Sequence, residues 1–473
     1  MKNILVVSAF FLSFLACKPE QEKLTYDSGA KLRFSTDTIF FDTVFTQVNT
    51  EIRNITRRLK VYNDSKNAVD IQSISLKQPN SPYIIYVNGR PSTNFHDTRL
   101  LGNDSLLILI EVTIDPMDEN LPFIVADEIS FITNDNEQDV KLVAWGQDAN
   151  FLKDSILACN ASWTNERPYV IFNSVLIDTL CTLTIEAGTK IYSHNGSYIF
   201  VKGTIAVQGT AENRVVFRND RLDFKDVPGQ WGGIIFLPGS KNNSIHYTDI
   251  RNAETGIYLG TPDDDVQADL LVANTTIENM GGNTNLPVRG GGLVLPGYGI
   301  LAVTSDLHMY NSLINNCAIN TVGNYAGGNY RYEHCTFASY SFDFFREDPS
   351  VVFSDNLFIG DDELLVNDLH VALINTIIWG DQKDEIMLSN GGEANFSLEM
   401  SHNLFRSTLT ALNNSGNILN EDPKFIKARE YNYRLDTLSP GKDKGFDIGL
   451  NIDHDGRERD SKPDIGAFER IEN

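Results

Sequence analysis

Seven short segments in the second half of the sequence place polar side chains at the same position of a repeat. Each segment ends at a large apolar residue: Ile250, Ile277, Ile314, Phe337, Phe358, Ile378 and Phe405. Because side chains alternate along a strand, the residue three before each of these is expected to point outward. In the last four repeats that residue is His334, Asp355, Asn375 or His402. Stacked strands lie about 4.8 Å apart, so the alignment predicts a polar stripe across neighbouring turns of the chain.

The chemistry available in such a stripe is acid–base catalysis or sugar binding. An imidazole beside a carboxylate can act as an oriented general base, so His334, Asp355 and His402 are the candidate catalytic residues. Asn375 in the stripe, and Trp379 and Arg406 just after the apolar residue of their repeats, are the candidate ligand-binding residues, as expected of a sugar-binding groove. The alternative interpretation is that these positions are polar simply because they face water.

The candidate metal ligands are three consecutive aspartates, Asp263, Asp264 and Asp265, which follow Pro262 in an apparent turn. Such a cluster can hold calcium, or it can merely solvate a loop. The sequence indicates no cofactor other than calcium at this cluster. The cysteines Cys159, Cys181, Cys317 and Cys335 lack the short spacing of zinc sites, and both disulfides and buried thiols remain open for them.

The repeat also predicts the fold that positions these residues. The apolar residues are 20 to 37 positions apart, with several short β-runs and no helical pattern between them. That period is typical of a parallel β-helix, in which each turn of the coil stacks on the next. The residue directly before the apolar one is also expected outward, which exposes Leu357, Ile377 and Leu404 in register. Something must cover them, such as a loop, the C-terminal segment, the N-terminal domain or a partner. If the C-terminal segment covers them, the neighbouring stripe is partly filled.

Alternating apolar and polar runs separated by turn residues occupy residues 32–149, which predicts a β-sandwich. The string LKVYNDSKNAVDIQSISL, followed by IEVTIDP and ISFITND, resembles immunoglobulin-like domains of the abnormal-spindle/hydin type. The resemblance implies a spacer or interaction module. The expected fold class is therefore all-β, with an N-terminal immunoglobulin-like β-sandwich followed by a right-handed parallel β-helix over residues 157–473.

The β-helix prediction also rests on a resemblance. LTIEAGTKI, YIFVKGTIAVQGT and GQWGGIIF are similar to the early coils of right-handed β-helices of the pectate-lyase-like superfamily. DPKF, YRLDTLSPGKDKG, DHDGRERD and PDIGAFE resemble the C-terminal signature of a choice-of-anchor β-helix family. This second resemblance implies a terminal cap in which Asp464 and Glu469 pair with arginines such as Arg457.

The N-terminal residues predict a targeting signal. Residues 1–17 combine an early lysine, a short apolar run and Phe-Leu-Ala-Cys, which resembles a bacterial lipoprotein signal with Cys17 as the lipidated residue. Residues 18–31 form a linker whose acidic start resembles the surface-export tags of Bacteroidetes lipoproteins. The predicted location is the outer membrane, with the chain anchored by lipid and exposed at the cell surface.

Composition narrows the function classes. The chain has 473 residues, 39 of them basic and 63 acidic, with a net charge of −24. Such an acidic chain does not bind nucleic acid by bulk charge. The GHG and RxPxxR patterns of β-helix enzymes are absent, which favours non-catalytic binding of a glycan or a surface protein. The alternatives are a polysaccharide lyase or glycoside hydrolase acting in an exposed groove, and a structural or adhesive stalk.

Overall fold

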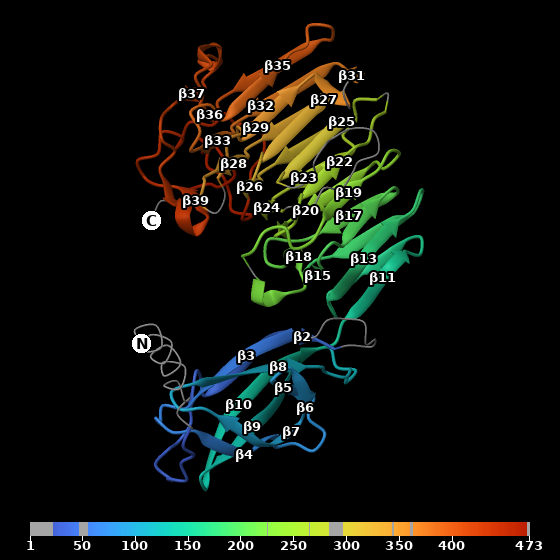
Figure 1. Ribbon diagram of the computed structural model, residues 1–473. Coiled ribbons are helices and arrows are strands. Elements are labelled where there is room, and N and C mark those ends of the chain that lie inside the picture. The colour runs from blue at the N-terminus through green and yellow to red at the C-terminus, as the bar shows by residue number, and fades with distance from the viewer. Residues whose placement is uncertain are drawn as a thin grey trace, which may run out of the picture. The chain divides into compact units, whose positions relative to one another are not determined.

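The regular structure of the described residues is β-strand with three short 3-10 turns, and the chain divides into two compact units, Met1–Asp148 and Ala149–Asn473 (Figure 1). The structure is a computed structural model that describes residues 22–46, 55–224, 226–263, 265–282, 297–342, 345–359 and 363–470. The predicted signal segment with Cys17, and Asp264 of the predicted metal cluster, lie outside the described residues. Within the described ranges, no helix has the length and apolarity needed to cross a membrane.

The first unit is a sandwich of two five-stranded sheets, as the alternating pattern predicts. One sheet contains, in spatial order, β1 (Arg33–Phe34), β3 (Ile55–Tyr62), β8 (Ser105–Val112), β5 (Tyr83–Val87) and β6 (Arg90–Ser92). The other contains β2 (Thr38–Phe45), β10 (Asn136–Gln147), β9 (Phe123–Thr133), β4 (Val69–Leu76) and β7 (Asn94–Leu100). All pairs are antiparallel except β2–β10. Alternate residues of the central strands, such as Ile108 and Ile110 of β8, are fully buried between the sheets.

The second unit is a coil of parallel strands with three faces, consistent with a parallel β-helix. The coil opens with β11 (Asn150–Ile156), which pairs with β13 (Tyr169–Ile177). Face A continues through the end of β13, β16 (Tyr198–Val201), β19 (Gly233–Phe236), β22 (Ile257–Leu259), the starts of β25 (Ile300–Tyr310) and β27 (Val322–Glu333), β29 (Val351–Ser354) and β34 (Ile386–Ser389).

Face B contains β12 (Ala161–Trp163), β14 (Thr182–Glu186), β17 (Thr204–Gln208), β20 (Asn243–His246), β23 (Leu270–Ala273), the ends of β25 and β27, β32 (Leu369–Ile374) and β35 (Phe396–Ser401). Face C begins beside the first residues of β13 and contains β15 (Lys190–Ser193), β18 (Val215–Asn219), β21 (Thr248–Arg251), β24 (Thr276–Met280), β26 (Leu313–Cys317), β28 (Thr336–Ser339), β33 (Ile377–Gly380), β36 (Leu404–Phe405) and β37 (Ile418–Leu419). Short 3-10 turns, η1 (Leu222–Phe224) and η2 (Thr410–Leu412), interrupt the loops.

The sequence repeat corresponds to face C, with one exception. Six of its apolar residues are completely buried in the core of the coil: Ile250, Ile277, Ile314, Phe337, Ile378 and Phe405. Phe358 is 67% exposed instead, because it belongs to a separate hairpin of β30 (Asn356–Ile359) and β31 (Glu363–Val366). The hairpin is inserted between β29 and β32, so the prediction that Leu357 stacks with Ile377 and Leu404 is wrong.

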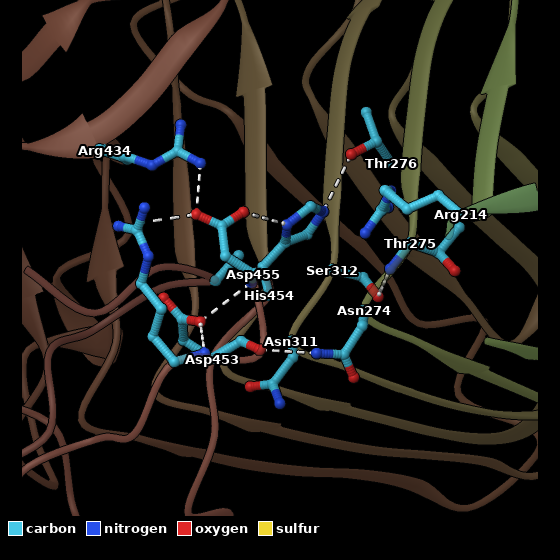
Figure 2. A network of polar contacts seen from close by, with 12 residues as sticks. Arg214, Asn274, Thr275, Thr276, Asn311, Ser312, Arg434, Asp453, His454 and Asp455 are labelled. Atoms are coloured by element: carbon cyan, nitrogen blue, oxygen red, sulfur yellow. Dashed lines mark hydrogen bonds and ion pairs between the residues drawn. The ribbon is translucent and has the colours of Figure 1, made fainter. Parts of the chain in front are cut away.

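The C-terminal arm, defined here as residues 421–470, packs against face C. It includes β38 (Phe425–Lys427), η3 (Ala428–Glu430) and β39 (Asn432–Leu435). Its Leu435 and Ile465 bury Ile377 and Leu404. The prediction that these residues are covered is confirmed, and of the four alternatives left open by the sequence the covering surface is the C-terminal segment. Figure 2 shows a polar part of the same contact, where His454 of the arm lies between Asp455 and Thr276.

The cysteines adopt two states. Cys159 and Cys181 form a disulfide near the start of the coil, whereas Cys317 and Cys335 are buried free thiols. Burial raises the pKa of both thiols to about 12, so neither is a reactive thiolate at neutral pH.

Candidate functional site

The predicted polar stripe lies at the corner between faces B and C, where the chain turns from one strand to the next. Three of its four residues, His334, Asn375 and His402, have left-handed backbone conformations, and so do the equivalent residues of earlier turns, Tyr247, Asn274 and Asn311, with φ between 43° and 54°. A left-handed residue reverses the local direction of the chain, so the alternation of side chains along a strand does not continue through it. The stripe therefore turns toward the arm rather than toward solvent.

Asn375 shows how completely this corner is occupied. It is fully buried, donates from Nδ2 to His334 Nε2 at 2.8 Å and to the Phe446 carbonyl at 2.7 Å, and accepts from the Phe446 amide at 2.8 Å. His334 is 1% exposed, and burial holds its pKa well below the ordinary histidine value. His402, on the next turn, is half-buried and stacks on the Phe446 ring at 5.2 Å.

The remaining predicted site residues are scattered. Asp355 is fully buried at the base of the inserted hairpin, where it accepts hydrogen bonds from the Gly391 amide at 2.8 and 3.0 Å. Trp379 is 7% exposed beneath the arm, with the Arg406 guanidinium 5.6 Å from its ring centre. The exposure predicted for His334, Asp355 and Asn375 is therefore wrong, because the arm and the hairpin bury them. A catalytic or binding role for these residues stays a prediction.

An open groove lies instead on face B, across β25, β27, β32 and β35. It has a volume of about 370 Å³. One wall is the loop between β22 and β23, through Val266 and Ala268, and the floor is formed by the outer side of the four strands. At the entrance to face B, β27 bends at Gly327 and Gly328, where φ is 75° and 119° and a Cβ atom would collide with neighbouring carbonyl oxygens. These glycines let β27 belong to two faces.

The strand register places the outward side chains of the groove in two rows. One row runs His308, Arg331, Ala372 and Glu399 across the four strands, and the next runs Asp306, Asn329, His370 and Ser397. The residues between the rows, such as Leu307 and Tyr330, point into the core and are buried. The groove therefore presents imidazole, guanidinium, carboxylate and amide groups from a rigid sheet.

A buried carboxylate beside the groove holds two of the residues that line it. Glu333, at the end of β27, is 5% exposed and accepts a hydrogen bond from His308 Nε2 at 2.8 Å and another from Arg331. Burial alone would raise the pKa of Glu333, but the hydrogen bonds from His308 and Arg331 hold it below its ordinary value. His308 is thus oriented by a charged partner, as a general base or a ligand-binding imidazole would be.

Acidic residues gather at the end of the groove beside the loop. Carboxylate oxygens of Asp263, Asp265 and Asp306 lie within 4.8 Å of one another. Burial raises the pKa of Asp306, and the charges of Asp263 and Asp265 raise it further. An all-oxygen donor set of this kind is suited to calcium. The structure thus brings two of the three predicted metal ligands together with Asp306, which is distant in the sequence.

The face B residues could have been found from the sequence only by aligning a second set of strands. The segments around His308, Arg331, His370 and Glu399 alternate correctly, but their mutual register depends on corner residues and on the length of the inserted hairpin. No sequence motif marks the face B groove, because each strand contributes only one or two side chains to it.

Comparison with known families supports the fold of the first turns. The sequence model of the pectate-lyase like beta helix domain family matches residues 155–312. The matched region is similar to such a domain and includes His308. A search of the curated proteins finds no match.

Solved structures show only distant likeness. A protein of unknown function from Porphyromonas gingivalis W83 is 15% identical, with a TM-score of 0.18 and coverage of 28% of this chain and 50% of that one. The E. coli chaperone DraB is 15% identical, with a TM-score of 0.17 and coverage of 24% and 54%. A family 123 glycoside hydrolase from Clostridium perfringens is 9% identical, with a TM-score of 0.18 and coverage of 27% and 26%. The chain thus spans about half the length of the first two, and these TM-scores are too low to infer a shared fold.

Proposed function

We propose that this protein is a cell-envelope lipoprotein, anchored to the outer membrane through lipid on Cys17, whose β-helix binds a polysaccharide in the face B groove. The lipoprotein part of the proposal is supported by the sequence pattern of residues 1–17. The binding part is supported by the similarity of residues 155–312 to pectate-lyase-like β-helix domains and by the geometry of the groove.

One observation carries the proposal. The groove collects His308, Arg331, His370 and Glu399 on neighbouring strands of an open sheet. Polysaccharides are recognised through many hydroxyl groups, so a rigid row of donors and acceptors with access to solvent is what binding requires. The polar corner under the arm lacks that access.

The experiment that tests it is a glycan array probed with the purified protein, with and without calcium, followed by calorimetry on each hit. Arg331→Gln is expected to weaken binding about 10- to 150-fold, because a hydrogen bond to a charged group contributes roughly 1.5–3 kcal/mol. Lys190→Gln, an exposed cation on another part of the coil, is the matched control and is expected to bind normally. Unchanged glycan affinity of Arg331→Gln would mean that the glycan does not bind in the face B groove. An array without hits would favour a structural stalk or binding of a surface protein.

A second candidate function, polysaccharide cleavage, is favoured by the hydrogen bond between His308 and Glu333. This contact, made through Nε2 at 2.8 Å, orients the imidazole of a residue that lines the groove. Each glycan that binds is therefore incubated with the protein and assayed for new reducing ends and for unsaturated products. If cleavage occurs, His308→Gln is expected to abolish it while retaining most of the binding. Binding without products leaves the recognition function.

A further inference from the structure

A second cavity lies on face C, away from the groove, where the C-terminal arm meets the coil. Its volume is about 270 Å³. Three separate segments contribute to its lining: the loop after η1 through Asp226, strands β21, β24 and β26 of face C, and the arm through Glu430 and Tyr431. Drug-sized ligands occupy pockets of about 300–1,000 Å³, so this cavity suits a compact molecule.

A ladder of asparagines makes one wall of the cavity rigid. Asn252 donates to Asn219 at 2.8 Å, Asn279 donates to Asn252 at 2.6 Å, and Asn316 donates to Asn279 at 2.9 Å. Asn316 also donates to the Tyr431 hydroxyl of the arm at 3.4 Å. Each amide is thus held by the next turn of the coil, and the ladder fixes the arm at the edge of the cavity.

The lining is rich in hydrogen-bond acceptors and negative charge. It contains the carboxylates of Asp226, Glu278 and Glu430. Glu278 pairs with the one guanidinium of the lining, Arg251, at 3.0 Å, and Glu430 pairs with the exposed Lys427 at 3.0 Å. Burial raises the pKa of Glu278, and the charge of Asp226 adds to that effect. A positively charged ligand beside Glu278 would favour the charged carboxylate and so lower this pKa.

Asn315 provides an independent observation that points to a ligand with a hydrogen-bond donor. This residue is fully buried, lines the cavity and donates from Nδ2 toward Glu278 at 3.5 Å. Its Oδ1 has no hydrogen-bond partner among the residues that the structure describes. An unsatisfied buried carbonyl is costly, and a donor held in the cavity is the group that could satisfy it.

The spacing of the carboxylates favours an organic cation over a metal ion. Within the described parts of the chain, Asp226, Glu278 and Glu430 do not form a group with donor atoms inside 4.8 Å, unlike Asp263, Asp265 and Asp306. A single metal ion needs its oxygen ligands at 2.3–2.6 Å, so carboxylates spread around a cavity suit a larger cation. Hydroxyl groups beside the charge would serve the amide acceptors.

We infer that this face C cavity binds a compact organic ammonium that also carries hydroxyl groups, of the chemical class of an amino sugar. The ammonium lies among Asp226, Glu278 and Glu430, and the hydroxyls hydrogen-bond to the asparagine wall. This site is separate from the face B groove and does not depend on its function.

The test is calorimetric titration of the purified protein with glucosamine, and with glucose as the uncharged match. Glucosamine is expected to bind and glucose is expected not to. Glu430→Gln and Asp226→Asn, which change exposed residues of the lining, are each expected to weaken glucosamine binding about tenfold. Glu421→Gln, an exposed acid of the arm outside the cavity, is expected to bind like the unmodified protein.

The inference is overturned if glucosamine does not bind, if glucose binds equally well, or if glucosamine affinity is unchanged in both cavity variants. Competitive displacement of glucosamine by calcium would also overturn it, since it would assign the cavity to a metal ion. Arg331→Gln of the groove is expected to bind glucosamine normally, which separates this test from that of the polysaccharide site.

Discussion

Two regions of the β-helix stack histidine and asparagine side chains on neighbouring turns, yet only one of them is open to a ligand. At the corner between faces B and C, His334 and Asn375 are buried beneath the arm and hydrogen-bonded to each other and to Phe446. In the face B groove, His370 and Arg331 line an open space. The residue types are similar, and the difference lies in whether the chain itself supplies the partners.

The comparison shows that stacked polar residues in a coil have two separate causes. At the corner, the left-handed backbone selects residues such as Asn, whose short polar side chain tolerates positive φ, and the polarity then serves the docking of the arm. On the strands of face B the backbone makes no such demand, so a charged residue there needs another reason. Functional interpretation is better founded on the strands than at the corner.

The largest expected effect concerns the docking of the arm. Arg459 pairs with Glu469 at 3.2 Å, and the two side chains are 2% and 5% exposed. Arg459→Met leaves Glu469 without its buried partner, so we expect the free energy of unfolding to fall by about 3–5 kcal/mol. Urea denaturation measures it. Lys427→Met removes the exposed pair with Glu430 and is expected to cost less than about 1 kcal/mol. Equal effects of the two changes would mean that the arm contributes little to stability.

The second prediction concerns the contribution of Asn375 to stability at the corner between faces B and C. Asn375→Ala removes the hydrogen bonds to both backbone groups of Phe446 and places a Cβ-only side chain at a φ of 53°. We expect a loss of about 2–3 kcal/mol in unfolding free energy, with unchanged glycan binding in the groove. Asn375→Gly is the matched variant, because glycine tolerates the backbone and loses only the side-chain contacts. Loss of glycan binding without loss of stability would mean that the corner between faces B and C takes part in glycan binding.

The third prediction concerns how stability depends on pH through the buried carboxyl group of Asp269. It lies beside the acidic end of the groove, accepts from Thr261 and from the Asp306 amide, and has its pKa raised by burial from 3.8 to about 6. The folded protein therefore holds this proton more tightly than the unfolded chain, and stability is lost as the pH rises between those two values. Asp269→Asn keeps a hydrogen-bond acceptor and cannot become charged. The unfolding free energy of this variant is therefore expected to fall by roughly 1–3 kcal/mol less than that of the unmodified protein over this pH rise.

The measurement for Asp269 is the unfolding free energy across that pH range, and Asp178→Asn, an exposed aspartate elsewhere on the coil, is the control. A pH profile that Asp269→Asn leaves unchanged would mean that the acidic end of the groove is well solvated. Because calcium at Asp263, Asp265 and Asp306 would stabilise the charged carboxylates, the same profile is measured with calcium present.

Much of the fold could be predicted because burial repeats with the turns of the coil. Ile250, Ile277 and Ile314 are equivalent core residues, and the pattern around them fixes face C. Phe358 matched the same local pattern but lies in a hairpin, because five residues of sequence cannot distinguish a turn of the coil from an insertion. The covering of Ile377 and Leu404 was predictable, since exposed apolar residues in register need a partner surface.

The site was less predictable for two physical reasons. Side-chain direction at the corner depends on a left-handed residue, such as His334, that ends the alternation of the strand. The groove and the acidic cluster are assembled from distant segments, and Asp306 joins Asp263 only because β25 follows β23 across face B. Neither relation is visible within one segment of sequence.

The smallest effect on stability is expected in the groove. Glu399 is exposed and points outward from β35 at the end of the row that begins at His308. Glu399→Gln keeps the size and the acceptor of the side chain, so the free energy of unfolding is expected to change by less than about 0.5 kcal/mol. Glycan affinity is expected to fall severalfold, because a charged acceptor is replaced by a neutral one. Calorimetry and urea denaturation on the same sample separate the two quantities. A change in stability as large as that of Asn375→Ala, with binding intact, would make the groove residues structural as well, and the distinction between the strands and the corner would fail.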